Sequence, residues 1–179
     1  MPADFEKAVA FVLEHEGGLS DHSADPGGIT NHGISLRFLR KLGSLALGDI
    51  DRDGDIDPDD IRKMSQSEAK RIYRAQWWER YGYGDLRQRT AAKLFDTAVN
   101  VGPFVAHKLA QEALNDCGIR VDIDGRIGPI TKAALNRVAE DMFISNFKQE
   151  QEAHYRALAR LNPDFAVFLR GWVRRARSG

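Results

Sequence analysis

Glu16 is the residue of this chain best placed to do chemistry. It stands where an apolar-patterned segment ends, and two glycines follow it directly. A glycine-rich stretch comes next, DPGGITNHGI over 25–34, with a second acid at Asp25 and a hydroxyl at Thr30. An acid held near apolar walls keeps its proton and can give it to a glycosidic oxygen. A second acid and a hydroxyl on a returning hairpin can hold a water on the other face of the sugar. The pattern is typical of glycoside hydrolysis.

Each of these residues also has a simpler interpretation. Glu16 could be a solvated acid in the last turn of a surface helix, although the helix dipole disfavours a negative charge there. Asp25 precedes Pro-Gly-Gly, a plain turn former, so it could do no more than cap that turn. Asp21 is a rival for the second acid. His32 is a candidate substrate contact, whereas a loop histidine is commonly only solvated.

Residues 49–60 have the spacing of an EF-hand calcium loop. Gly54 stands at the sixth position, where such a loop turns sharply. The candidate ligands are Asp49, Asp51, Asp53, Asp55, Asp57 and Asp60. The last of them replaces the usual bidentate glutamate. Acids so crowded repel one another strongly without a cation, which favours a Ca²⁺ site over a solvated acidic turn. The preceding segment, 37–48, is a poor entering helix, so we expect a structural ion and no calcium sensor.

Bulk properties narrow the range of partners. The chain has 179 residues, enough for one domain, with 42% hydrophobic residues and a formal net charge of zero. A neutral chain gives no electrostatic case for nucleic acid. Its single cysteine forms no intrachain disulfide, and the N-terminus lacks the pattern of a secretion signal. We expect a monomer that is made in the cytoplasm without a signal peptide and needs no cofactor for catalysis.

Periodicity predicts a mostly α-helical fold. Apolar residues at helical spacing predict helices over 3–15, 36–43, 66–80, 91–99, 104–116, 131–139, 141–160 and 165–177. Residues 19–34 are rich in Ser, Asp, Gly and Pro, and we interpret them as an irregular hairpin that lines a cleft. Ser35 is a predicted N-cap, and Ser65 with Glu68 has the spacing of a capping box.

Several motifs resemble those of the family 108 glycoside hydrolases, which are N-acetylmuramidases found among phage endolysins and bacterial prophage proteins. The segments EGGL over 16–19 and DPGGITNHGI over 25–34 resemble the family's catalytic part. The family's C-terminal peptidoglycan-binding-type region is resembled by FDTAVNVGP over 95–103, DGRIGPIT over 124–131 and FLRGWV over 168–173. The motifs occur in order over nearly the whole chain. The acidic loop resembles an insertion shared by part of the family.

The resemblance implies a lysozyme-like helical fold and hydrolysis of the β-1,4 bond between N-acetylmuramic acid and N-acetylglucosamine in peptidoglycan. Glu16 aligns with the family's catalytic glutamate and would be the general acid, while Leu19 stands where a tyrosine is usual. Asp25 and Thr30 would hold the water, which implies inversion. Residues 1–90 would form the catalytic region and 91–179 the binding-type region, packed as one lysozyme-like unit. The enzyme would reach the periplasmic wall through holin-dependent release.

Aromatic and amide side chains further along are candidates for binding the glycan, because rings stack on sugars and amides bond acetamido groups. They are Tyr73, Trp77, Trp78, Asp96 and Asn100. One of the two adjacent tryptophans is expected in the core, and Asn100 could be a helix cap. The basic tail over 168–177 is a candidate for weak membrane contact, against packing of its apolar face on the domain.

Two other functions compete with hydrolysis. The chain could be a catalytically silent protein on the same fold that binds peptidoglycan or assists secretion. A lytic transglycosylase would cleave the same bond without water and leave a 1,6-anhydro product. The candidate water-holding groups favour hydrolysis.

Overall fold

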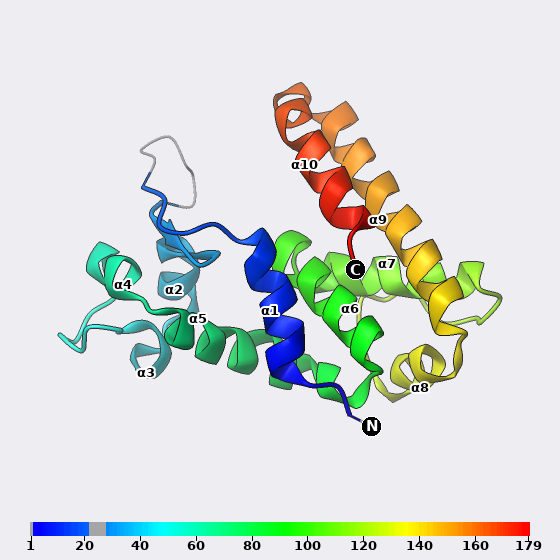
Figure 1. The fold of residues 1–179 in the computed structure, drawn as a ribbon, viewed down its shortest axis with the longest axis horizontal. Helices are drawn as coiled ribbons and strands as arrows, with labels where there is room; N and C mark the ends of the chain where they lie inside the picture. Colours follow the sequence, from blue (N-terminus) through cyan, green and yellow to red (C-terminus); the bar gives the residue numbers. More distant parts are fainter. Residues whose placement is uncertain (1, 22–27) are drawn as a thin grey trace. The chain divides into compact units, whose positions relative to one another are not determined.

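The computed structural model describes residues 2–21 and 28–179, and most of this chain is helical (Figure 1). The longer α-helices are α1 (Phe5–His15), α5 (Gln66–Tyr73), α6 (Gln88–Val101), α7 (Pro103–Asp116), α8 (Pro129–Arg137), α9 (Glu140–Leu161) and α10 (Ala166–Arg177). The shorter ones are α2 (Leu36–Leu42), α3 (Leu45–Gly48) and α4 (Pro58–Lys63). Strands β1 (Thr30–Asn31) and β2 (Ile34–Ser35) form one small antiparallel sheet. The predicted mostly-α class is confirmed.

Side-chain caps fix the first residues of helices α2 and α5, as predicted. The Ser35 hydroxyl accepts from the Phe38 amide at 3.1 Å and begins α2. The Ser65 hydroxyl accepts from the Glu68 amide, and the Glu68 carboxylate accepts from the Ser65 amide at 2.7 Å. Both caps satisfy backbone groups that the first helical turn leaves open. Both predicted caps are therefore confirmed.

One predicted helix differs in its second half. α5 ends at Tyr73, and the chain continues to Glu79 as a π-helical segment, η1 (Arg74–Glu79). The sequence predicts one continuous α-helix to about residue 80, because periodicity does not register a single widened turn. Segments of this kind occur often at functional sites. Here it carries both adjacent tryptophans.

The chain divides into two compact units, and each is described by itself. One is Val9–Gln76, and the other combines Met1–Ala8 with Trp77–Gly179. The predicted division between residues 90 and 91 falls inside α6. The unit Val9–Gln76 holds the hairpin, the acidic loop and the end of α1 at Glu16.

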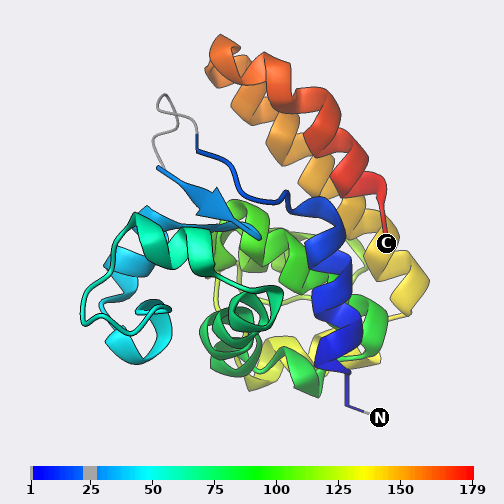
Figure 2. The ribbon, with the colours of Figure 1, turned by 60° about the vertical axis from the view of Figure 1, so that its left-hand side comes forward.

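The other unit is built around α6, α7 and α9. Its aromatic core joins rings from α1, η1, η2 (Tyr83–Asp85) and α6, namely Phe5, Trp78, Tyr83 and Phe95. α10 lies beside α9 as the second arm of a helical hairpin in both views (Figures 1 and 2). No helix among residues 2–21 and 28–179 combines the length and apolar character that crossing a membrane requires.

A buried lysine holds the end of α10. The Nζ of Lys93 donates to the carbonyl oxygens of Arg175, Ala176 and Ser178, at 3.0, 2.7 and 2.9 Å. Burial lowers the pKa of Lys93 to about 8. Because the last carbonyls of a helix have no partner within the helix, this ammonium satisfies them and interacts favourably with the helix dipole.

A buried histidine ties α7 to the loop after it. His107 is 2% exposed, its Nδ1 lies 3.1 Å from the Gly125 carbonyl oxygen, and its Nε2 lies 2.8 Å from the Tyr83 hydroxyl. A carbonyl only accepts, so Nδ1 carries a proton, and in the neutral ring Nε2 accepts from the tyrosine hydroxyl. Burial lowers the pKa of His107 from the ordinary value of 6.5 to about 4.

We predict a pH-dependent stability from this residue. The folded pKa lies below the unfolded one, so the contribution of His107 is complete above pH 6.5 and is lost as the pH falls toward 4. Its size is of the order of 3 kcal/mol. Urea unfolding of wild type and His107→Gln at a series of pH values checks this. The variant should lose less free energy of unfolding across that interval, and parallel curves would contradict the prediction.

Candidate active site

Glu16 lies directly after the last residue of α1. Its amide still donates to the Val12 carbonyl at 3.2 Å, so the backbone completes the helical turn before Gly17 leaves it. Val12 is fully buried, whereas the Glu16 side chain is half-buried. The carboxylate thus stands at the border of the apolar core and solvent. A proton donor for an exposed polymer needs such a place.

The hairpin that follows has a two-residue turn. β1 pairs with β2 in the register Thr30–Ser35 and Asn31–Ile34, which leaves His32 and Gly33 as the turn. Both have positive φ, 48° and 77°. A type I′ turn needs this at both central residues, and glycine adopts it without strain. The Asn-His-Gly-Ile sequence therefore closes a tight hairpin within the predicted segment 19–34, of which residues 22–27 lie outside the described residues.

This turn lies against the Glu16 carboxylate. Ser20 and Thr30 exchange two backbone hydrogen bonds, of 2.8 and 2.9 Å, which align the chain after Glu16 with β1. A Cβ atom on Gly33 would lie 2.6 Å from Oε2 of Glu16, closer than carbon and oxygen approach without bonding. The carboxylate fills the space that any other residue at 33 would need. Gly33 is required for both its conformation and its missing side chain.

Tyr73 forms the other side of this contact. Its hydroxyl also lies within the space of a Gly33 Cβ, and it donates to the His32 carbonyl at 2.9 Å. The ring, predicted to stack on a sugar, is fully buried in this structure and presents no face to solvent. The residue instead fixes the turn beside Glu16. Its helical spacing from buried Ala69 on α5 is the signal that places it inside.

A buried amide anchors the hairpin from below. The Nδ2 of Asn31 donates to the carbonyls of Ile61 and Met64, at 3.0 and 3.2 Å. These two carbonyls belong to the C-terminal end of α4. The side chain is 7% exposed. The hairpin is therefore tied to the helix that follows the acidic loop, a role that sequence reasoning missed because nothing in the local pattern distinguishes Asn31 from a turn residue.

The groups expected to hold water are only partly visible. Asp25 lies outside the described residues. Thr30 is half-buried on β1, and its hydroxyl donates to the Gly28 carbonyl at 3.3 Å. The rival acid, Asp21, forms an ion pair of 3.2 Å with Arg62. That pairing gives Asp21 a surface partner, while Thr30 stands on the strand that enters the turn beside Glu16.

The remaining substrate candidates belong to the unit with residues 77–179. Trp78 is 6% exposed in the aromatic core, so it is the core member of the tryptophan pair. Trp77 is half-buried, and its Nε1 donates to the Ala98 carbonyl at 3.3 Å. The Oδ1 of Asn100 accepts from the Tyr155 hydroxyl at 2.5 Å, inside α6 and not at its cap. Trp77 keeps a solvent-facing part for a ligand.

Asp96, predicted to contact the substrate, lies in the core of this unit. Its side chain is fully buried, and its Oδ1 accepts from Nη2 and Nε of Arg175, at 2.8 and 3.1 Å. A buried carboxylate is stable only when paired in this way. Asp96 therefore holds α10 on α6 and offers no oxygen to a sugar. Sequence spacing alone does not reveal a partner 79 residues away.

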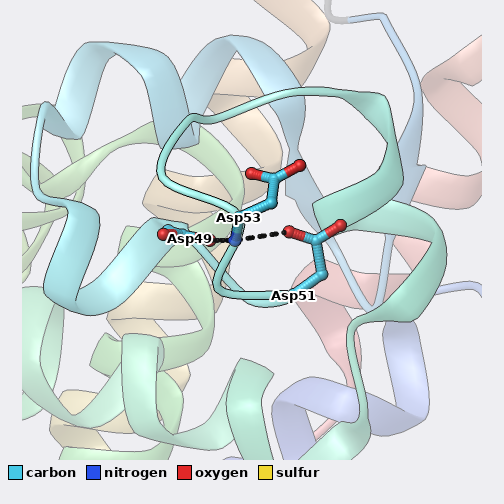
Figure 3. A group of neighbouring side chains, drawn as sticks. All are labelled: Asp49, Asp51 and Asp53. Carbon is cyan, nitrogen blue, oxygen red and sulfur yellow. Dashed lines mark hydrogen bonds between the residues drawn. The ribbon is translucent and has the colours of Figure 1, made fainter.

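The acidic loop gathers its carboxylates in two groups. Asp49, Asp51 and Asp53 each offer an oxygen within 4.8 Å of the others (Figure 3). The second group contains Asp55, Asp57 and Asp60. The EF-hand assignment stays a prediction.

Two acids of the second group, Asp57 and Asp60, accept hydrogen bonds from backbone amides. The oxygens of Asp60 accept from the amides of Ile50 and Asp57, at 2.6 and 2.7 Å, and Asp57 accepts from Asp59. This is a capping box at the start of α4. Repulsion from Asp53 is the main cause that raises the pKa of Asp55. Lys63 offsets part of the loop's negative charge through an ion pair of 2.7 Å with Asp51, and a cation would relieve the repulsion that remains around Asp55.

The geometry defines a class of protein. A lysozyme-like helical fold presents a half-buried glutamate directly after its first helix, beside a glycine-containing hairpin, and a half-buried acid of this kind suits the proton donor of a glycoside hydrolase. Residues 9–102 match the family model described as glycosyl hydrolase 108. Residues 105–177 match that of a predicted peptidoglycan domain. The chain belongs to the glycosyl hydrolase 108 family, and the two domains together define a peptidoglycan hydrolase.

Solved structures agree. The chain is similar to the structure described as that of Brucella abortus SagA, with a TM-score of 0.73 and 30% sequence identity. The match covers 96% of this chain and 88% of that one. A search of curated protein sequences found no significant match.

We predict that Gly33→Ala lowers activity on peptidoglycan about 100-fold. The new methyl group would displace the Glu16 carboxylate, and a misplacement of about 1 Å costs a factor of this size. Clearing of purified sacculi measures the rate.

Gly43→Ala is the matched control. Gly43 also has a positive φ, 64°, but a Cβ there would meet nothing within 4 Å. Both variants should lose about 1 kcal/mol of stability for the strained backbone, and Gly33→Ala should lose more because its methyl group also meets Glu16 and Tyr73. Only Gly33→Ala should lose activity, so equal rates for the two variants would show that the close approach to Glu16 is unimportant.

Proposed function

We propose that this peptidoglycan hydrolase is an N-acetylmuramidase of the endolysin type. It cleaves the β-1,4 bond between N-acetylmuramic acid and N-acetylglucosamine, with Glu16 as general acid. The observation that carries the proposal is the position of that carboxylate. Glu16 is half-buried directly after α1, and its carboxylate occupies the space that a Cβ atom at Gly33 would need. An acid fixed in this way can donate along one direction only, which positions it for the leaving oxygen.

Water would attack from the opposite face of the sugar. We assign Asp25 and Thr30 to hold it, with Asp25 outside the described residues and Thr30 on β1. Hydrolysis that begins from a held water inverts the anomeric carbon. The anomer formed first, followed by NMR before it equilibrates, distinguishes inversion from retention. A retained configuration would remove the water-holding role and leave the acid role of Glu16 intact.

We predict that Glu16→Gln abolishes clearing of sacculi while the protein still folds and still binds them. Loss of a general acid costs about 100- to 10,000-fold in rate. Glu14→Gln is the matched control, because Glu14 is an exposed acid on the same helix and should keep full activity. Turbidity gives the rate, and mass spectrometry identifies the new reducing ends.

The products separate the competing functions. Hydrated muramic acid ends establish a muramidase, and glucosamine ends would establish cleavage of the other glycosidic bond. Anhydro ends, lighter by one water, would establish a lytic transglycosylase. A folded wild type that binds sacculi and releases nothing, with or without calcium, would identify a silent binding protein.

We also propose a structural Ca²⁺ in the acidic loop. The first group of carboxylates, Asp49, Asp51 and Asp53, offers oxygens at the spacing of loop positions 1, 3 and 5, and hard oxygen donors suit this ion. An ion there would stiffen the loop that leads into α4. Because α4 anchors the hairpin through Asn31, the ion would stabilise the turn beside Glu16 without touching substrate.

We predict that saturating Ca²⁺ raises the melting temperature by about 5 to 10 °C, from about 2.7 kcal/mol of linked binding at a hundredfold excess over Kd. Asp53→Asn should remove most of the shift. Asp122→Asn, an exposed acid outside the loop, should leave it unchanged. Differential scanning calorimetry measures each. An equal shift in all three proteins would exclude this loop as the site.

A further inference from the structure

The outer half of the α9–α10 hairpin contains no fully buried residue. The last buried residue of α9 is Tyr155, and the next buried residue along the chain is Arg175. Residues 156–174, here called the hairpin tip, contain no buried residue. Helices of a globular domain usually hide an apolar face along their length. The hairpin tip therefore presents to solvent side chains that a simple packing role would cover.

Large apolar side chains gather at the turn of the hairpin tip. The exposed ones are Leu161 at 84%, Val167 at 76%, Phe168 at 54% and Phe165 at 37%. The turn is nonetheless ordered, because Trp172 stacks on Tyr155 and Phe168, with centroids 5.4 and 5.8 Å apart. Several large apolar side chains exposed within one short segment indicate an interaction site.

Positive charge surrounds this apolar turn. Residues 156–177 contain six arginines and one acid, Asp164, although the whole chain is neutral. Three of these arginines have partners: Arg175 binds Asp96, while Arg156 and Arg177 bind Glu152. Hydrogen bonds from Arg177, then Arg156, lower the pKa of Glu152 to about 2. For the other three, Arg160, Arg170 and Arg174, the described residues record no ion pair.

A groove runs along the same part of the hairpin. Its floor is apolar, formed by Ala166, Leu169 and Val173. Its rim is basic, with Arg170 and Arg174 among four arginines, and its volume is about 590 Å³. A guanidinium binds a phosphate in a bidentate manner, and the adjoining floor suits a hydrocarbon chain.

We propose that the hairpin tip binds an anionic phospholipid bilayer, with Leu161, Val167 and Phe168 inserted among the acyl chains and arginines on the headgroup phosphates. Exposed apolar side chains on a turn can enter the acyl layer of a bilayer, and the arginines beside them match its anionic phosphates, whereas an uncharged glycan would leave these guanidinium groups without a counter-charge. A second copy of the chain is disfavoured, because the same arginines would face one another across the interface.

Cosedimentation with vesicles tests the proposal. Wild type should bind vesicles of phosphatidylcholine and phosphatidylglycerol, should not bind phosphatidylcholine alone, and should dissociate as salt is raised. Arg170→Gln with Arg174→Gln should weaken binding about 25-fold, since each charge near an anionic surface contributes a factor of about five. Leu161→Ser with Val167→Ser should weaken it tenfold or more.

Matched controls lie on the same unit. Ile130→Ser removes an apolar side chain that is 79% exposed on α8, and Arg120→Gln with Arg137→Gln removes two exposed arginines. These controls should bind like wild type, and all variants should keep its melting temperature and its rate on purified sacculi.

Several outcomes would overturn the proposal. They are equal binding to neutral vesicles, no binding to anionic ones, and losses in the controls as large as those in the tip variants. Tip variants that lose sacculus binding would assign the surface to the wall. A wild-type dimer that the tip variants dissociate, seen by light scattering, would assign it to a second copy.

Discussion

The contact between the Glu16 carboxylate and the backbone of Gly33 is the constraint on which the site depends. It requires a helix that ends at one residue, a hairpin whose two-residue turn has positive φ twice, and no side chain at its second position. Each of these requirements concerns a short stretch of sequence, but only the tertiary structure brings the three together at one place. A carboxylate pressed on backbone has few alternative positions, which is what preorganises an acid for directed proton donation.

A succession of hydrogen bonds supports that contact. Tyr73 holds the turn through the His32 carbonyl, and Asn31 ties the hairpin to the end of α4. The start of α4 is in turn fixed by the capping box of the acidic loop. This succession links a charged surface loop to the position of Glu16 through hydrogen bonds and, at its last step, through the close approach of the carboxylate to Gly33. It gives the loop a physical reason to influence catalysis without supplying a ligand to the substrate.

The helical fold was largely predictable because its signals are local. Apolar periodicity located the long helices to within a few residues, and Ser35 and Ser65 cap as their spacing indicates. The π-helical segment after Tyr73 was not predicted, since one extra residue in a turn barely alters the apolar periodicity. Substrate contacts were harder to predict from residue type alone, because burial decides whether a polar or aromatic side chain faces a ligand or packs in the core.

The sequence by itself determined the class: a helical protein with an acid after its first helix, a glycine hairpin and an acidic loop. Only the tertiary structure decided the partners of individual side chains. Asp96 pairs with Arg175, far along the chain, and Trp78 enters the core while Trp77 stays half-exposed. Such choices depend on long-range packing, in which a buried charge must find a counter-charge, and no local pattern carries that information.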